Sequence, residues 1–157
     1  VTPVSYGGRM TLIETNIDDM SPELLAYARD RLLQNGAADA WLTPIWMKKG
    51  RPATMLSALC DDGLVLALSR IVLEETTTLG MRSRPVDRIV ADREVVSFES
   101  SLGQAQAKAK LIDGRVVAVA PEFEACRVLA ERHGMPLHDV YRTVEREARA
   151  LLGAAES

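Results

Sequence analysis

The residues of this sequence that could do chemistry gather in three short polar stretches, and the most basic of them comes between two apolar runs. Lys48, Lys49 and Arg51 stand together at a break marked by Gly50 and Pro52. A lysine ammonium is a compact point charge and an arginine guanidinium is a planar fork, so the cluster suits the oxygens of a phosphate chain. The alternative is a solvated hairpin tip, because short basic runs are common on protein surfaces.

The second stretch is acidic and precedes the first expected helix. On a β-strand Glu14, Asn16 and Asp18 project to one side, so two carboxylates and an amide would line one patch. Such oxygen ligands suit a hard divalent cation that bridges to phosphates, which makes Glu14 and Asp18 candidate metal ligands. The alternative is that Asp18 or Asp19 caps the helix and Glu14 pairs with a lysine.

The third stretch combines hydroxyl groups with arginines. Thr77 and Thr78 supply hydroxyls close to a glycine, and Arg82 and Arg84 would point two guanidinium groups to one side of a strand. The alternative is an ordinary helix end followed by an exposed basic strand edge.

Other conspicuous residues carry less weight. His133 and His138 lack a second histidine at metal-ligand spacing, and His133 is expected to complement the dipole at a helix end. Trp41 and Trp46 fall on opposite faces of one expected strand. We expect one of them in the core, and the other is a candidate to stack on a ligand or to pack at a subunit interface.

Composition limits the classes of function. A chain of 157 residues with 47% hydrophobic and 26% charged residues suits one globular domain, and no apolar run approaches the roughly 20 residues of a membrane span. A net charge of -3 with 4% aromatic residues argues against a nucleic-acid platform. Cys60 and Cys126 are expected to be buried thiols of a cytoplasmic protein. Because the chain begins at Val1, we expect it to be part of a longer protein.

The elements that must position these residues follow a recognisable order in the first part of the chain, 1–90. Strands are expected at 9–18, 38–49, 52–60 and 76–90, with helices at 22–35 and about 61–75. This order is that of a ferredoxin-like split βαβ unit, in which the first and third strands are central. The threonine turn and the basic turn therefore need not meet within one subunit. Pro44 favours an edge position or a bulge for the second strand.

The second part, 91–157, is expected to add a β meander and two C-terminal helices packed as part of the same domain. Strands are expected at 93–100, 104–112 and 115–120, and helices begin at Pro121 and Pro136. Alanine alternates with polar residues over 104–112, so one face of that strand must be exposed to solvent. The predicted fold class is α+β, a ferredoxin-like βαββαβ core with an additional β meander and C-terminal helices.

Four stretches, in order between about Arg9 and Leu152, carry a resemblance: ETNIDDM, GAADAWLTPIWMKKGRPA, ETTTLGMR and VAPEFEACRVLAERHGMPL. They resemble the C-terminal region of the nickel insertion protein (LarC) family. The resemblance implies a CTP-dependent cyclometallase of the lyase class that inserts nickel into pyridinium-3,5-bisthiocarboxylic acid mononucleotide. The product is the nickel-pincer cofactor of lactate racemase. It also implies a ferredoxin-like fold, a hexamer, and CTP bound with Mn²⁺ or Mg²⁺.

The resemblance also implies roles for the polar stretches. The implied triphosphate contacts are Lys48, Lys49, Arg51, Arg82 and Thr77 or Thr78. The implied carboxylates, which hold the divalent ion or accept a proton from the pyridinium ring, are Glu14, Asp18 and Asp19. The expected partners are the nucleotide, the pincer precursor, the N-terminal region of the same protein and further copies of the chain, with no nucleic acid and no membrane. The alternative is a non-catalytic trimeric or hexameric module that binds or senses a nucleotide or metabolite.

Overall fold

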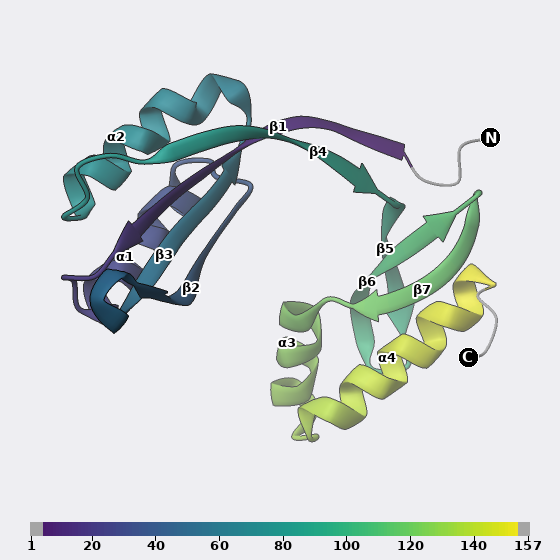
Figure 1. Cartoon of the computed structure of the whole chain (residues 1–157). Helices are drawn as coiled ribbons and strands as arrows, with labels where there is room; N and C mark the ends of the chain where they lie inside the picture. Colours follow the sequence, from purple (N-terminus) through teal and green to yellow (C-terminus); the bar gives the residue numbers. More distant parts are fainter. Residues whose placement is uncertain (1–4, 154–157) are drawn as a thin grey trace. The chain divides into compact units, whose positions relative to one another are not determined.

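A computed structural model describes residues 5–153, which form two compact units (Figure 1). The ferredoxin-like unit is Gly7–Arg88, and the C-terminal unit runs from Ile89 onward and includes Ser5 and Tyr6. The predicted packing of the two parts as one domain stays a prediction. The outermost residues assigned to them, 1–4 and 154–157, lie outside the described residues.

The ferredoxin-like unit has the predicted order of strands and helices. Its elements are β1 (Ser5–Ile17), α1 (Pro22–Gln34), β2 (Asp39–Met47), β3 (Arg51–Cys60), α2 (Val65–Glu75) and β4 (Arg82–Val90), with 3-10 turns at Lys48–Gly50 and Asp62–Leu64. The strands of this sheet lie in the order β2-β3-β1-β4. The first and third strands are therefore central, and β2 lies at an edge as Pro44 predicts.

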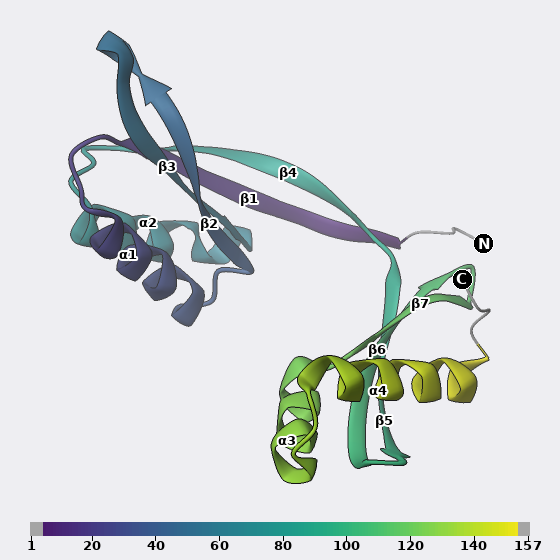
Figure 2. The same ribbon diagram turned by 90° about the horizontal axis from the view of Figure 1, so that it is seen from below.

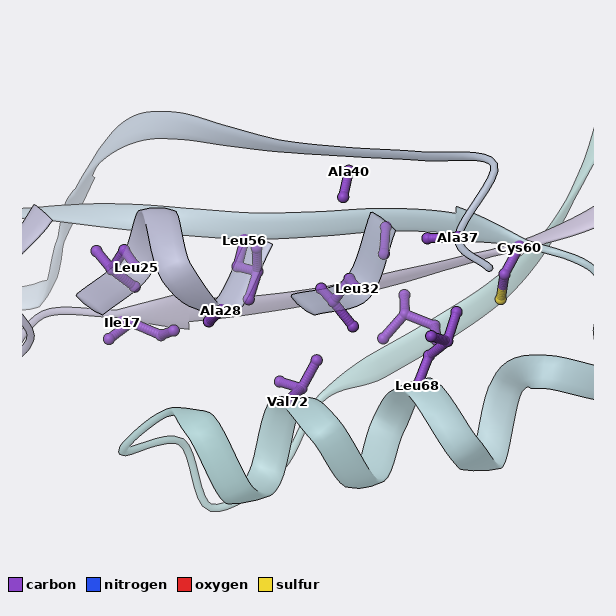
Figure 3. Close-up of a cluster of buried hydrophobic side chains, with 12 residues drawn as sticks. Ile17, Leu25, Ala28, Leu32, Ala37, Ala40, Leu56, Cys60, Leu68 and Val72 are labelled. Atoms are coloured by element: carbon purple, nitrogen blue, oxygen red, sulfur yellow. The ribbon is translucent and has the colours of Figure 1, made fainter. Parts of the chain in front are cut away.

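Both helices of this unit pack on one face of the sheet. Ser21 caps α1 by accepting a hydrogen bond from the Leu24 N–H, and Pro22 occupies the first turn. Buried apolar side chains then recur at helical spacing along α1 and α2. Figure 3 shows the resulting core, whose buried members include Ile17, Leu25, Ala28, Leu32, Leu56, Leu68 and Val72.

Alternation along β1 decides which polar residues face the helices. Ile13 and Ile17 belong to the core, so Thr15 points to the same side and is buried with them. Glu14 and Asn16 point to the opposite, helix-free face. This strand therefore presents different polar groups on its two faces.

The C-terminal unit is a three-stranded antiparallel sheet with two helices. It contains β5 (Asp92–Ser100), β6 (Gly103–Ile112), β7 (Arg115–Pro121), α3 (Phe123–His133) and α4 (Leu137–Leu152), and its strands lie in the order β5-β6-β7. In Figure 2, α4 runs alongside this sheet. The alanines of β6 are buried on one face and its polar residues are exposed on the other, which confirms the predicted alternation.

Several predicted details were wrong. Pro121 ends β7 instead of opening a helix, and α3 begins at Phe123. Neither tryptophan enters the core: the exposed fraction is 37% for Trp41 and 77% for Trp46, since Trp41 lies on the helix-free face and Trp46 lies near the end of an edge strand. His133 lies in the last turn of α3, at a helix end as predicted, and its ring nitrogen Nε2 lies 2.7 Å from the Leu102 carbonyl oxygen.

The two cysteines are buried and unpaired with each other, as predicted. Burial raises the pKa of the Cys60 and Cys126 thiols, so both stay protonated near neutral pH. Over the described part of the chain, no helix combines the length and apolar character needed to cross a membrane.

Candidate functional site

Three connections of the ferredoxin-like unit lie at the same end of its sheet, which we call the loop end (Figure 1). They are the β1–α1 connection (18–21), the basic turn between β2 and β3 (Lys48–Arg51) and the threonine loop before β4 (76–81). Strand register places them at the same end, because Ile17 at the end of β1 pairs with Thr54, close to the start of β3. On the other side of β1, Arg82 at the start of β4 contacts Asn16.

The basic turn is tight and exposed. Lys49 has φ 62° and ψ 21°, in the left-handed region that residues with a β-carbon rarely enter, and Gly50 follows with φ 66°. This backbone carries Lys48, Lys49 and Arg51 into solvent. Their side chains have no hydrogen-bond or ion-pair partner within residues 5–153. Three cationic groups are therefore free to meet an anion.

A cavity of about 290 Å³ lies beside the basic turn. It is bordered by the end of β1, the start of α1 and the start of β3. Its lining consists of Ile17, Asp18, Met20, Pro22, Pro52, Ala53 and Thr54. The Asp18 side chain has no partner among the residues that the structure describes, so its carboxylate can bind something else.

The threonine loop is held to β1 and to the β1–α1 connection on the helix side. The Thr77 hydroxyl donates to the Asp19 carboxylate, and the Thr77 N–H donates to the sulfur of Met20 at 3.3 Å. The Thr78 and Thr15 hydroxyl oxygens lie 2.6 Å apart, and Thr78 also donates to the Gly80 carbonyl at 2.7 Å. These hydroxyls therefore fix the loop.

Arg82 lies on the helix-free face and reaches over β1. Its Nε is 3.4 Å from Oε2 of Glu14, and its Nη2 is 3.1 Å from Oδ1 of Asn16 and 3.1 Å from the sulfur of Met55 on β3. The Glu14 side chain is 14% exposed and that of Arg82 is 53% exposed. Glu14 thus pairs with an arginine and not with the lysine that the sequence alternative supposed.

The structure divides the predicted site residues into two groups. Those already bonded within the chain are Glu14, Asp19, Thr77, Thr78 and Arg82. Those without a partner in the described part of the chain are Asp18, Lys48, Lys49 and Arg51. Asp18 lies beyond the end of β1 at Ile17, so the strand alternation that aligned it with Glu14 does not extend to it.

No group of three or more His, Cys, Asp or Glu side chains within residues 5–153 is arranged to hold a metal ion. Glu14 and Asp18 therefore do not form a complete metal site from protein ligands alone. Any divalent cation here would need most of its oxygen ligands from a bound molecule.

Sequence reasoning missed two residues that build the loop end. Thr15 connects β1 to the threonine loop, and its position between buried Ile13 and Ile17 on an inward strand face was an available signal. Met55 contacts Arg82 across β1. That contact depends on strand order, and no local pattern in the sequence marks it.

The chain is similar to proteins of one family over nearly its whole length. The family model described as nickel insertion protein matches residues 5–141. A relative from Roseiflexus castenholzii is 47% identical over 135 residues, which are 86% of this chain and 34% of the relative. The pyridinium-3,5-bisthiocarboxylic acid mononucleotide nickel insertion protein of Thermotoga petrophila is 38% identical over 145 residues, which are 92% of this chain and 36% of that protein.

Two solved structures have similar folds. The C-terminal domain of a cyclometallase involved in the synthesis of the NPN cofactor of lactate racemase, in its apo form, is 34% identical with a TM-score of 0.80, covering 87% of this chain and 94% of that one. Protein MK0293 from Methanopyrus kandleri is 23% identical with a TM-score of 0.67, covering 92% of both chains, and this likeness concerns the fold alone. The chain spans about a third of the length of the curated relatives. It belongs to the nickel insertion protein family and corresponds to the C-terminal domain of its members.

Proposed function

We propose that this chain is the CTP- and divalent-metal-binding domain of a nickel insertion enzyme, a CTP-dependent cyclometallase of the lyase class. The full enzyme inserts nickel into pyridinium-3,5-bisthiocarboxylic acid mononucleotide and forms the nickel-pincer cofactor of lactate racemase. Nickel is a substrate in this proposal. The names of the similar proteins support the reaction, and the loop end supports the nucleotide site.

One observation carries the nucleotide site: three unpartnered cations adjoin a cavity that contains an unpartnered carboxylate. Lys48, Lys49 and Arg51 are exposed on a turn whose backbone is constrained. Ammonium and guanidinium groups form strong, charge-assisted hydrogen bonds with phosphate oxygens. In our proposal these side chains bind the triphosphate. Thr77 and Thr78 hold the neighbouring loop, and their hydroxyls contact phosphate only if they leave their present partners.

The acidic residues fit a metal ion that arrives with the nucleotide. Mg²⁺ and Mn²⁺ in nucleotide sites are commonly held by one or two carboxylates together with phosphate oxygens and water. Asp18 would be the first such carboxylate, with Asp19 beside it, whereas Glu14 is occupied by Arg82. The divalent ion, when bound, neutralises phosphate charge and polarises the phosphoryl groups.

The same carboxylates are candidates for the proton transfer. Bonding a metal to a pyridinium ring carbon requires loss of the ring proton, and a carboxylate near that carbon can accept it. Asp18 is the best placed of the three predicted carboxylates because it has no partner in the described part of the chain. Glu14 would first have to release Arg82, and Asp19 would have to release Thr77.

The remaining parts of the proposal concern the assembly. The matched residues are only about a third of each curated relative, so we propose that the N-terminal region of the full protein completes the nickel site. We further propose a homo-oligomer, a trimer or hexamer, that acts in the cytoplasm.

Calorimetric titration with CTP and Mn²⁺ tests the nucleotide site. We expect Lys48→Ala and Arg51→Ala each to weaken binding by about tenfold or more, since each removes charge-assisted hydrogen bonds. The matched control is Lys110→Ala, which removes an exposed lysine from β6 in the C-terminal unit. Unchanged thermal unfolding would show that the fold is intact. Wild-type affinity in both variants would remove the basic turn from the site.

Turnover separates the enzyme from a binding module. When the full-length protein is given nickel, the pincer precursor and CTP, our proposal expects CTP consumption that Asp18→Asn reduces. Tight CTP binding with no consumption in the full-length protein would favour the non-catalytic alternative.

A further inference from the structure

Trp46 is an exposed aromatic side chain at the loop end. Its exposed fraction is 77%, and its side chain has no hydrogen bond or ring contact within the described part of the chain. It stands two residues before Lys48, at the end of β2. Because so little of this aromatic ring is removed from water, its burial contributes little to the free energy of folding of the isolated chain.

Strand register places Trp46 beside the cavity. Trp46 pairs with Pro52, and directly paired residues of antiparallel strands point to the same face of the sheet. Pro52 lines the cavity, and so does Thr54, which lies on the same face two residues along β3. Thr54 in turn pairs with Ile17, whose side chain faces the helices. Trp46 therefore stands on the helix side of the sheet, next to the lining residue Pro52 and close to the basic turn.

Trp41 provides a contrast within the same strand. It pairs with Ser57, is 37% exposed and lies on the opposite face, five residues from Trp46. It is thus separated from the cavity by the sheet. Of the two tryptophans in the chain, only Trp46 stands on the side of the unpartnered Asp18.

An exposed ring next to a cluster of cations has the composition of a nucleotide site. Cations track phosphates, and an aromatic side chain stacks on a base, since every base has a π-face. A site for inorganic phosphate would need only the cations and no aromatic ring. We propose, building on the nucleotide site proposed above, that Trp46 stacks on the base of the nucleotide whose triphosphate is bound by Lys48, Lys49 and Arg51. Stacking is tolerant of base identity, so Trp46 contributes affinity and does not select cytosine.

The test compares CTP with inorganic tripolyphosphate, each with Mg²⁺, by calorimetry. We expect Trp46→Ala to weaken CTP binding by about tenfold and to leave tripolyphosphate binding unchanged, because only CTP carries a base. Trp46→Phe should retain most of the CTP affinity. Lys48→Ala should weaken both ligands. In a Trp41→Phe background, where Trp46 is the remaining tryptophan, CTP should quench the fluorescence and tripolyphosphate should not.

The outcomes separate this inference from the proposed function. If Trp46→Ala binds CTP like the wild type while Lys48→Ala does not, the stacking role is wrong and the phosphate site stands. Equal losses for CTP and tripolyphosphate in Trp46→Ala would indicate a structural effect and overturn the stacking role. Emission of Trp46 that changes with protein concentration and not with CTP would assign the ring to a contact between copies. If the wild type binds neither ligand, the proposed nucleotide site itself fails.

Discussion

Polar residues at two places in the molecule are used differently. Around the helices of the C-terminal unit several of them bond to one another: Arg127 contacts Glu124 at 2.9 Å and Glu131 at 2.6 Å, and the Ser101 hydroxyl donates to Glu147 at 2.5 Å. At the loop end of the ferredoxin-like unit, the basic turn and Asp18 have no such partners within residues 5–153. Charges that the fold does not use are the better candidates for binding a ligand.

The two cores differ as well. The ferredoxin-like unit buries leucine and isoleucine side chains between its helices and sheet. The C-terminal unit also buries Leu129, Val140 and Val144, but its sheet contributes a row of alanines on β6. One of them, Ala107, packs with Val119 and with Ala148 of α4. Small side chains on facing elements allow close approach of helix and sheet, so this core has little room for larger groups.

The largest predicted effect tests whether the two units are separate. Leu32→Ala removes a fully buried side chain from the ferredoxin-like core and should lower the free energy of unfolding by about 2–5 kcal/mol. Leu33→Ala, at a 42% exposed neighbour, is the control and should cost far less. Hydrogen exchange should show lost protection in α1, α2 and β3 and none lost in β6 and α4. Equal loss of hydrogen-exchange protection in both units would support the predicted single domain. It would contradict the description of two separately stabilised units.

A smaller effect is expected from overfilling the other core. Ala107→Leu inserts a larger side chain where Ala107 and Ala148 are both fully buried, and it should destabilise the protein by about 1–3 kcal/mol in urea unfolding. Lys110→Leu makes a similar side chain on the exposed face of the same strand. If Ala107→Leu is no worse than this control, the close alanine packing is not a constraint.

The smallest predicted effect concerns how the hydrogen-bonded carboxylate of Glu147 makes stability depend on pH. Hydrogen bonds from the Ser101 hydroxyl and N–H lower the pKa of Glu147. A lowered pKa in the folded state gives stability that is present above the unfolded pKa and is lost as the pH falls through the folded value. Glu147→Gln should therefore cost about 0.5–1 kcal/mol at pH 7 and little in strong acid, where the carboxyl group is protonated in both the folded and the unfolded state.

Exposed Glu94 supplies the control for this prediction. Thermal unfolding of Glu147→Gln and Glu94→Gln is compared at both pH values. A constant difference between the two variants across pH would show that the hydrogen bonds to Glu147 do not stabilise its charged form.

Local sequence patterns predicted much of the fold. The alternating alanines predicted which face of β6 is buried and which is exposed to solvent. Pro44 favoured an edge strand, and the order of elements predicted the split βαβ unit. The tryptophans were misjudged because strand alternation tells which face a ring occupies but not whether anything covers that face. Pro121 was misjudged because proline is tolerated at the end of an edge strand as well as at a helix start.

The candidate site was less predictable than the fold. Residue types drew attention to the basic turn, but they could not show that Glu14 is taken by Arg82, nearly seventy residues away. Bonds of this kind depend on strand order and on which loops share an end of the sheet. For the same reason, the sequence could not show that Thr77 and Thr78 are hydrogen-bonded within the chain whereas Asp18 has no partner in its described part.

A crystal structure of this chain with CTP and manganese tests the central claim most directly. We expect the triphosphate against Lys48, Lys49 and Arg51, the anomalous signal of manganese next to Asp18, and the Glu14–Arg82 pair unchanged. Density for the nucleotide away from residues 48–51, with manganese remote from Asp18, would contradict the account.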